Sequence, residues 1–429
     1  MVRLVPLLTV LIVGYLVLVL GRERPVPAAR VFGGPSDGLA RWTGWVEAAT
    51  RADGQTPLGG ALEIRGRAVD GRTSTSRATL DAEGRAEIAL DFGASPPGAF
   101  EIEVRGGGAE LARGRIALSV ERWRASAGRR GGYYPVQSRG GLSLTAAPGR
   151  GAFAVPFAAP LWLRVERGGR PIAGAEISVE SEGATIQPAR VQTDARGIAV
   201  TSLAPREHVV TLRARTRSGE LSAELTASVP VVPGALLAER RERRLLVASP
   251  IEREQASVTL VSESGRWLGA RVALRPDGRG GAIGELALPD FPEPRLFAVV
   301  ESERGVPSDA RVGWPLFELP GEPVSTFDVR DALLLDGFAA AARRERERQL
   351  RVRRIAVGIG LLGSLISVFL VLIAVRLDQR RLHAHLAAQV DAETEARLAP
   401  GSRSGSLLAI CLIVLGFVVV AAVAAWRLG

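Results

Sequence analysis

The sequence contains no lysine and no asparagine, and it has one cysteine and one methionine among its 429 residues. All 55 basic residues are therefore arginine, and this composition indicates a GC-rich bacterial coding bias rather than a binding signature. The only cysteine, Cys411, excludes an intrachain disulfide and any metal site built from several thiolates. A domain outside the cytoplasm must therefore be stabilised by its hydrophobic core alone.

Histidine is also scarce, and the sequence lacks the metal and phosphate motifs of common enzymes. His208 lies on a predicted strand, whereas His383 and His385 are about 200° apart around a predicted helix and cannot readily share a metal ion. No His-Glu-x-x-His motif and no phosphate-binding loop is present. We therefore expect no enzymatic activity, no cofactor and no metal, and we assign no residue to a catalytic, cofactor-binding or metal site.

The net charge of +10 is modest for this length. Arg213, Arg215 and Arg217 fall on one face of a predicted strand, and other arginines alternate with glutamates. This pattern favours a solvated strand face over a nucleic-acid groove, so we expect no nucleic-acid partner.

Three long apolar runs contain no charged residue, and an uncharged run of about 18 residues or more is long enough to span a lipid bilayer. The sequence therefore predicts a bacterial cytoplasmic (inner) membrane protein with the bilayer as a partner. Its predicted membrane elements are an anchor at 1–21, transmembrane helices at 355–375 and 406–426, and a short basic loop at 376–405. Because the apolar runs at 4–20, 355–375 and 407–426 carry no Asp, Glu, Arg or His, a transport path is not expected.

The first apolar run has a second interpretation as a signal peptide, with Val26-Pro27-Ala28 as its cleavage site. The apolar stretch is long for a signal peptide, and the charged residues 22–24 intervene before that site. We therefore interpret the run as an uncleaved signal anchor.

The orientation is less clearly encoded, because arginines flank both ends of the second span. A literal count of positive charge places the large middle region in the cytoplasm, but this rule is weak for long translocated domains. We expect the amino terminus inside and the middle region outside the cytoplasm.

The middle region alternates apolar and polar residues, as in Ala86-Glu87-Ile88-Ala89-Leu90, which is typical of half-buried strands. Short strands of this kind, separated by Gly and Pro, favour sandwiches. The sequence predicts a mainly β fold, with tandem β-sandwiches at 39–122 and 142–232, a Gly/Arg-rich linker at 123–141, a divergent third sandwich at 233–327 and a helical stalk at 328–354. Asp328 and Asp331 are expected to supply the cap and acidic first turn of this stalk.

An internal repeat supports the first two sandwiches. Pro57 is followed by Asp81-Ala82-Glu83-Gly84, and Pro171 is followed at almost the same interval by Asp194-Ala195-Arg196-Gly197. An Asp that opens and a Gly that closes such a segment predict a type I turn with the glycine in the left-handed region.

The second copy, Pro171-x-x-Gly174-Ala175-x-Ile177 followed by Thr193-Asp194-Ala195-x-Gly197 and Glu207–Leu212, resembles bacterial immunoglobulin-like domains and the macroglobulin-like domains of bacterial surface proteins. The resemblance covers the second copy well and the first moderately. It implies immunoglobulin-like sandwiches that contact other envelope molecules. The thioester chemistry of macroglobulins is not implied, because no cysteine lies outside the apolar runs.

Two further segments have competing interpretations. Gly358–Gly363 matches the glycine pattern of dinucleotide-binding loops, but it lies inside an apolar run. Small residues that allow close helix packing are the better explanation, with a membrane helix as a possible partner. The connector 128–141 holds Tyr133 and Tyr134 among Arg and Gly; we interpret it as a linker, with a protein or glycan contact and a nucleic-acid tract as alternatives.

These features favour a non-catalytic, membrane-anchored scaffold or interaction protein of the cell envelope that binds a protein or glycan partner. The alternative is an accessory or sensory subunit of a membrane complex.

Overall fold

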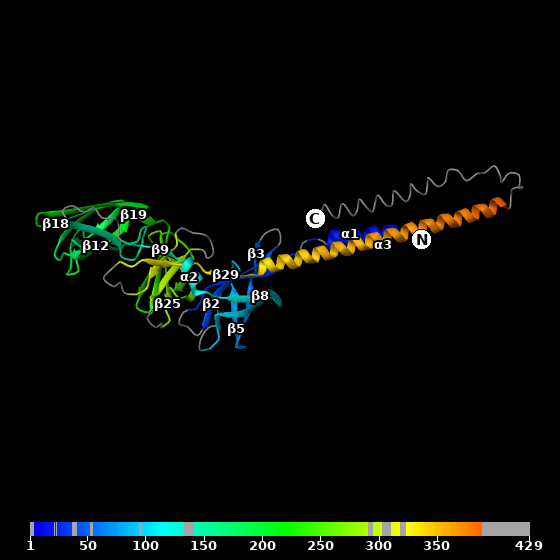
Figure 1. Ribbon diagram of the computed structural model, residues 1–429, viewed down its shortest axis with the longest axis horizontal. Coiled ribbons are helices and arrows are strands. Elements are labelled where there is room, and N and C mark those ends of the chain that lie inside the picture. Colours follow the sequence, from blue (N-terminus) through cyan, green and yellow to red (C-terminus); the bar gives the residue numbers. More distant parts are fainter. Residues whose placement is uncertain are drawn as a thin grey trace. The chain divides into compact units, whose positions relative to one another are not determined.

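The computed structural model describes residues 4–20, 22, 24–36, 41–51, 55–93, 97–132, 141–290, 295–302, 310–317 and 323–387. The chain divides into two units (Figure 1). Unit 1 comprises Met1–Pro27, Thr50–Thr56 and Phe338–Gly429, and unit 2 comprises Ala28–Ala49 and Pro57–Gly337. The fold is mainly β, as predicted, and nearly all of the strands belong to unit 2.

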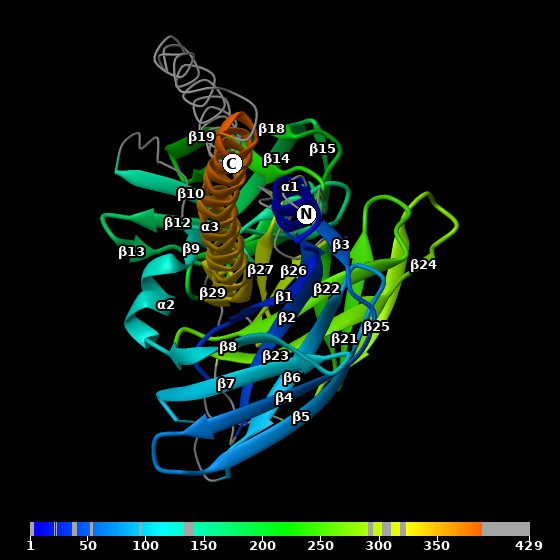
Figure 2. The same ribbon diagram turned by 90° about the vertical axis from the view of Figure 1, so that its right-hand side faces the viewer.

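Sandwich 1 encloses a core of inward side chains from two sheets, including Trp42, Ile64, Leu90 and Phe100. In one sheet β29, β1 and β2 are neighbours and β6 pairs with β2; the other has the order β5-β4-β7-β8 (Figure 2). The strands are β1 (Val26–Gly33), β2 (Arg41–Arg51), β3 (Gln55–Pro57), β4 (Gly60–Ala68), β5 (Thr73–Leu80), β6 (Arg85–Asp91), β7 (Ala99–Gly106), β8 (Ala109–Ala117) and β29 (Ala332–Asp336).

Sandwich 2 has its own core and consists only of residues that are consecutive in the sequence. Its sheets have the orders β10-β12-β17-β15, with β13 beside β12, and β11-β19-β18-β14-β16. The strands are β10 (Leu142–Pro148), β11 (Phe153–Ala154), β12 (Ala159–Arg167), β13 (Arg170–Pro171), β14 (Glu176–Glu182), β15 (Ala184–Gln187), β16 (Arg190–Gln192), β17 (Ile198–Pro205), β18 (Val209–Ser218) and β19 (Leu221–Val232).

Sandwich 3 pairs a sheet of order β20-β21-β25-β24 with one of order β23-β22-β26-β27 around a core that includes Trp267 and Trp314. The strands are β20 (Leu237–Arg241), β21 (Arg244–Ser249), β22 (Gln255–Val261), β23 (Arg266–Ala273), β24 (Arg275–Pro276), β25 (Ala282–Ala287), β26 (Phe297–Glu301) and β27 (Val312–Pro315). The described residues therefore form three sandwiches, and their assignment as immunoglobulin-like stays a prediction.

The segment predicted as a linker at 123–141 is partly folded. Residues Val120–Ser126 form α2, which begins after the cap Ser119, and Gly128–Arg130 form β9, which pairs with β28 (Thr326–Asp328). Trp123 and Phe327 pack with Val261, Phe297 and Val299 in a cluster beside the main core of sandwich 3. This apolar packing explains why residues 120–130 are folded. Tyr133 and Tyr134 lie outside the described residues.

The Asp–Gly turns of the repeat have the same geometry. Oδ1 of Asp81 accepts hydrogen bonds from the amides of Glu83 and Arg85, each at 2.9 Å, and Oδ1 of Asp194 accepts from those of Arg196 and Ile198 at the same distance. Gly84 and Gly197 have φ of 73° and 71°, as the turn prediction requires. Asp277 makes the corresponding bonds to the amides of Arg279 and Gly281, so sandwich 3 contains the same turn.

The predicted stalk at 328–354 is wrong at its beginning. Residues Ala332–Asp336 form β29, an antiparallel neighbour of β1 in which Asp336 lies opposite Arg30. The helix α3 (Gly337–Ala387) follows at once and has no acidic residue in its first turn. The buried side chain of Asp328 belongs to β28, and Leu334 and Leu335 pack on the core of sandwich 1, so tertiary burial overrides the helical pattern at this point.

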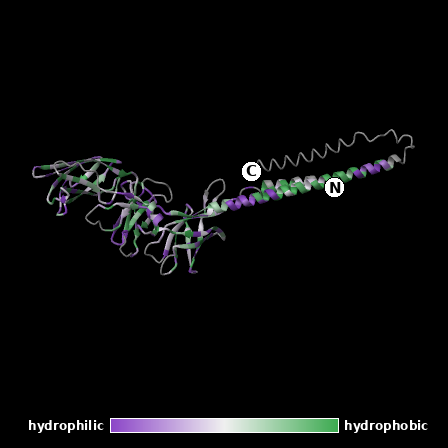
Figure 3. Cartoon of the chain, viewed as in Figure 1, coloured by the Kyte–Doolittle hydropathy of each residue, from purple (hydrophilic) through white to green (hydrophobic). Residues whose placement is uncertain are grey.

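The prediction of three transmembrane helices is not supported. Within the described residues one helix, Gly337–Ala384, is long and apolar enough to cross a membrane. The first apolar run forms the shorter helix α1 (Leu4–Tyr15) followed by a π-helix at Leu16–Leu20, and the run at 406–426 lies outside the described residues. Figure 3 shows a hydrophilic stretch in the first part of α3, followed by a long hydrophobic stretch.

Within unit 1, α1 and α3 lie side by side in opposite directions (Figure 1). A Cβ added to Gly363 would overlap the side chain of Thr9, and one added to Gly360 would lie 3.7 Å from Val13. The close helix approach predicted at these glycines is therefore present, with α1 of the same chain. The hydroxyls of Ser364 and Ser367 donate to carbonyls of their own helix at 2.7 Å.

Candidate ligand-binding cavity

A polar cavity of about 350 Å³ lies within unit 2, between strands of sandwiches 1 and 3. Its lining consists of charged and neutral polar side chains: Glu83, Arg85, Arg253, Gln255, Ser257, Arg271 and Ser302. The cavity volume lies at the lower end of the range for small-molecule sites. An all-polar lining suits a hydrophilic ligand rather than an apolar one.

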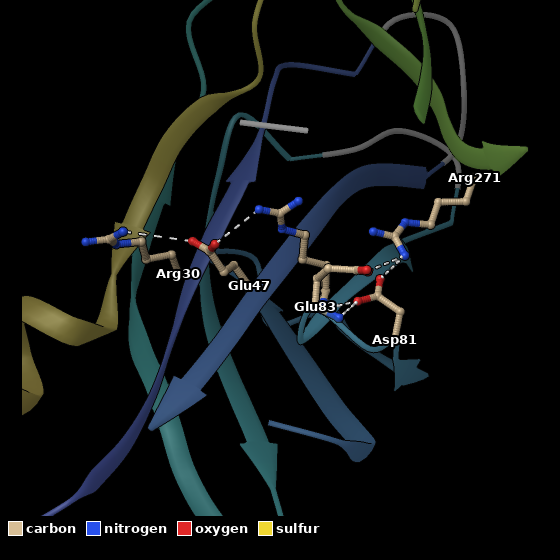
Figure 4. A network of polar contacts seen from close by, with 6 residues as sticks. Arg30, Glu47, Asp81, Glu83 and Arg271 are labelled. Carbon is tan, nitrogen blue, oxygen red and sulfur yellow. Dashed lines mark hydrogen bonds and ion pairs between the residues drawn. The ribbon is translucent and has the colours of Figure 1, made fainter. Parts of the chain in front are cut away.

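The Asp81 turn places one wall of this cavity. Because Asp81 Oδ1 is used by backbone amides, its second oxygen is directed to Arg271, whose Nη1 lies 2.8 Å from Asp81 Oδ2 and 3.0 Å from Glu83 Oε2 (Figure 4). The hydrogen bond from Arg271 holds the pKa of Glu83 below its ordinary value, so this carboxylate is ionised at neutral pH. Arg271 therefore joins β23 of sandwich 3 to the turn of sandwich 1.

A second pair of arginines shares one carboxylate beside this wall. Glu47 lies 3.7 Å from Arg85 and 3.9 Å from Arg30 (Figure 4). Arg30 also lies 3.4 Å from Asp336. The guanidinium carbon of Arg85 is 6.0 Å from the centre of the Trp45 ring, a distance that suits a cation–π contact. The carboxylates Glu47, Asp81 and Glu83 are thus all engaged by Arg30, Arg85 or Arg271.

Arg253 also lines the cavity, and it forms no ion pair with Glu47, Asp81 or Glu83. Its Nε atom is buried and has no hydrogen-bond partner among the described residues. Gln255 and the buried Ser257 follow on β22, and Ser302 lies just beyond β26. These side chains can donate and accept hydrogen bonds next to a positive charge. The arrangement can therefore hold an anion that also carries hydroxyl groups.

A buried ion cluster beside the cavity joins the same two sandwiches. Arg266 is fully buried; its Nε donates to Asp331 at 2.9 Å and its Nη2 donates to Glu87 at 3.0 Å. The amide of Arg266 donates to the Pro35 carbonyl at 2.6 Å. A Cβ on Gly269 would overlap the ends of both Arg266 and Glu87, so a larger residue here would displace this ion pair. The expectation that the arginines are solvated is wrong for Arg266.

Glu301, next to the cavity residue Ser302, is a titratable group within this contact. Burial raises its pKa to about 7, although Arg311 at 3.7 Å acts in the opposite direction. Arg311 also pairs with Asp328 at 3.4 Å. Glu301 therefore exchanges its proton near neutral pH, unlike an exposed glutamate.

The histidines named from the sequence do not join this site. His208 is exposed just before β18, and His383 is exposed on α3, where His385 also lies. Among the described residues no group of three or more His, Cys, Asp or Glu side chains could hold a metal ion. The site prediction of no catalytic, cofactor-binding or metal residue stays a prediction.

One further sequence pattern, Gly34-Pro35-Ser36-Asp37-Gly38, matches the Gly-x-Ser-x-Gly form of a nucleophile elbow. The hydroxyl of Ser36 donates to the Arg41 carbonyl at 2.8 Å, and Ser36 forms a bridge with Arg266. Such an elbow needs a strand that turns sharply into a helix; residues 37–40 lie outside the described residues, and the next described element is the strand β2. The match has no catalytic context.

Sequence reasoning missed the arginine-lined cavity, although a signal for it exists. The two turn copies differ at the positions that build the wall: sandwich 1 has Glu83 and Arg85 where sandwich 2 has Arg196 and Ile198. Sandwich 1 thus has an acidic residue in place of Arg196 and an arginine in place of the apolar Ile198. An arginine at an apolar position of the same turn indicates that this face of sandwich 1 contacts polar groups. The pairing of Glu83 with Arg271, 188 positions further along the chain, is not readable from the sequence.

Comparisons with known proteins leave the family open. No family model matches the chain, and no curated protein matches it. A tetra-tandem repeat of a large adhesion protein matches at a TM-score of 0.18 and 11% identity, over 72% of this chain and 74% of that chain. The adhesin InvE of Yersinia pseudotuberculosis matches at 0.18 and 15%, over 55% and 69%. The alpha-2-macroglobulin of E. coli matches at 0.18 and 11%, over 66% and 25%. TM-scores this low carry no argument about fold or function.

Proposed function

We propose that this chain is a membrane-anchored protein of the bacterial cell envelope that presents its β-sandwiches outside the cytoplasm to a protein or glycan partner, without catalysis. The observation that supports this function most directly is the pairing of β1 with β29. β1 begins at Val26, shortly after the apolar helix that ends at Leu20, and β29 ends at Asp336, directly before α3. The chain therefore enters and leaves the β region at the same end of one antiparallel strand pair.

Contacts inside unit 1 support a paired anchor. Arg348 on α3 donates to the carbonyls of Leu20 and Arg22, each at 2.7 Å, so a cation satisfies carbonyls at the end of the first apolar segment. Glu345 accepts from Arg348 and from the Arg24 amide at 3.1 Å. The hydrogen bond from Arg348 lowers the pKa of Glu345, which keeps the pair charged at the polar start of α3.

The outward face of α3 suits lipid. Leu362, Leu365 and Phe369 expose 60%, 68% and 63% of their surface, which is costly in water and favourable in a bilayer. Two helices that cross the membrane in opposite directions would leave everything between them on one side. This pairing supports a β region that lies on one side of the membrane, and its placement outside the cytoplasm is part of the proposal.

A span exchange tests the anchoring role. The apolar residues 355–375 are replaced by an unrelated apolar helix of equal length, and partner recovery is measured by crosslinking in native membranes followed by mass spectrometry. A presenting scaffold retains its crosslinked partners after the exchange. Loss of those partners, with the protein still in the membrane, would instead favour the accessory or sensory subunit of a membrane complex.

A matched pair of variants tests the helix pairing itself. In a Cys411→Ala background, Thr9→Cys combined with Gly363→Cys is expected to form a disulfide in oxidised membranes, because these positions are in contact. Thr9→Cys with Leu365→Cys is the control, since Leu365 lies on the exposed face of α3. Equal crosslinking of both pairs, or of neither, would contradict the paired anchor.

A further inference from the structure

We infer that the cavity between sandwiches 1 and 3 is a binding site for a small hydroxylated anion, of the size of a monosaccharide and bearing a carboxylate or a phosphate. The inference goes beyond the proposed function and does not depend on the membrane anchor. It rests on the partly buried Arg253, whose Nε is buried without a hydrogen-bond partner among the described residues, on the polar lining around it and on the cavity volume of about 350 Å³.

The charge distribution selects an anion. Around the cavity, Arg30, Arg85 and Arg271 already share the carboxylates of Glu47, Asp81 and Glu83. Among the described lining residues, the three guanidinium groups of Arg85, Arg253 and Arg271 stand against the single carboxylate of Glu83. A partly buried cation without a carboxylate partner is costly, and an anionic ligand would remove this cost through charge-assisted hydrogen bonds.

The neutral lining selects hydroxyl groups on the ligand. Gln255 offers an amide that both donates and accepts, and Ser257 and Ser302 each offer a hydroxyl. The carboxylate of Glu83, held ionised by Arg271, can accept from a ligand hydroxyl. No aromatic or aliphatic side chain is among the lining residues that the structure describes, so a ligand with a large apolar part is not favoured.

The geometry is fixed before a ligand arrives. Arg85 and Arg271 are held by ion pairs, and the buried Arg266 cluster stabilises the two sandwiches on either side of the cavity. A site whose side chains are held by other contacts loses little freedom on binding, which favours affinity. Arg253 then supplies the charge that recognises the ligand.

The test is ligand-observed NMR of the full chain in detergent with three probes: glucuronate, glucose 6-phosphate and neutral glucose. We expect at least one of the two anions to bind and glucose to bind at least tenfold more weakly. Binding of glucuronate alone assigns a carboxylate ligand, and binding of glucose 6-phosphate alone assigns a phosphate ligand. Failure of both anions, or equal binding of glucose, overturns the inference.

Two matched variants identify the residue responsible. Arg253→Gln is expected to weaken anion binding at least tenfold, whereas Arg253→Lys, which keeps the charge, loses less. Arg275→Gln is the control, because Arg275 is an exposed arginine of the same sandwich that does not line the cavity. Unchanged binding to Arg253→Gln, with near-ultraviolet circular dichroism as for the parent, would overturn the assignment.

Discussion

Sandwich 2 and the contact between sandwiches 1 and 3 use arginine in opposite ways. In sandwich 2, Arg215 pairs with Glu224 at 3.0 Å while both side chains are about half exposed or more, at 62% and 49%. In the contact, Arg266 pairs with Glu87 and Asp331 with no exposure of its own side chain. An exposed pair adds little stability, whereas breaking a buried one leaves uncompensated charges. The same residue type is therefore a solvated surface in one region and the centre of an interface in the other.

The largest effect is expected from Arg266→Ala. This change leaves Glu87 and Asp331 without their cation, which should destabilise the contact by about 3–5 kcal/mol. Tryptophan fluorescence during urea unfolding reports it, because five of the seven tryptophans lie in or beside sandwiches 1 and 3: Trp42, Trp45, Trp123, Trp267 and Trp314. A loss of less than about 1 kcal/mol in the free energy of unfolding would show that the cluster does not stabilise the contact between the two sandwiches.

A pH dependence should separate the contact from sandwich 2. An unfolded glutamate ionises near 4.5, but folded Glu301 holds its proton until about pH 7. Between these values the folded state binds more protons, so its stability should fall as pH rises from 4.5 to 7 and then level off, by roughly 3 kcal/mol in total.

The matched variant for this pH dependence is Glu301→Gln, which cannot ionise and should lose this part of the slope. Denaturant unfolding at pH 5, 6, 7 and 8 measures it in both proteins. A parent and variant with parallel pH profiles would mean that Glu301 is already ionised in the folded protein.

An intermediate effect is expected from Gly269→Ala. The new methyl group would overlap Arg266 and Glu87, and overpacking of this kind costs about 1–3 kcal/mol. Gly59→Ala is the control, because a Cβ at Gly59 meets nothing within 4 Å. Equal midpoints of urea unfolding for the two variants would contradict the tight packing around the buried ion pair.

The smallest effect is expected from Arg215→Ala in sandwich 2. Its exposed pair with Glu224 should contribute no more than about 0.5–1 kcal/mol, and added salt should reduce even that. Thermal unfolding at low and high salt measures the contribution of this pair to stability and its dependence on salt. A loss as large as that of Arg266→Ala would remove the contrast between the two regions.

Local features of the fold were predictable because they depend on neighbours in the sequence. Alternation along β6 identified a strand with Ala86, Ile88 and Leu90 inward, and the spacing of Asp81 and Gly84 identified a tight turn. The close helix approach at Gly363 was also readable from small residues one turn apart. Each of these signals is short in range.

The remaining features depend on contacts between distant parts of the chain. Residues Ala332–Asp336 look like the beginning of a helix, but pairing with β1 makes them a strand of sandwich 1. Burial of Arg266 depends on Glu87, which precedes it by 179 residues, and on Asp331. For the same reason the cavity, built from a turn of sandwich 1 and strands of sandwich 3, could not be predicted from local pattern.

The sidedness of the β region tests the proposed function most directly. Val200 in sandwich 2 is 46% exposed, so in a Cys411→Ala background Val200→Cys provides a single accessible thiol. A membrane-impermeant maleimide is added to intact spheroplasts and to lysed ones. The proposal predicts equal labelling of Val200→Cys before and after lysis. Labelling only after lysis would place the β region in the cytoplasm and contradict an envelope protein that presents its sandwiches outside.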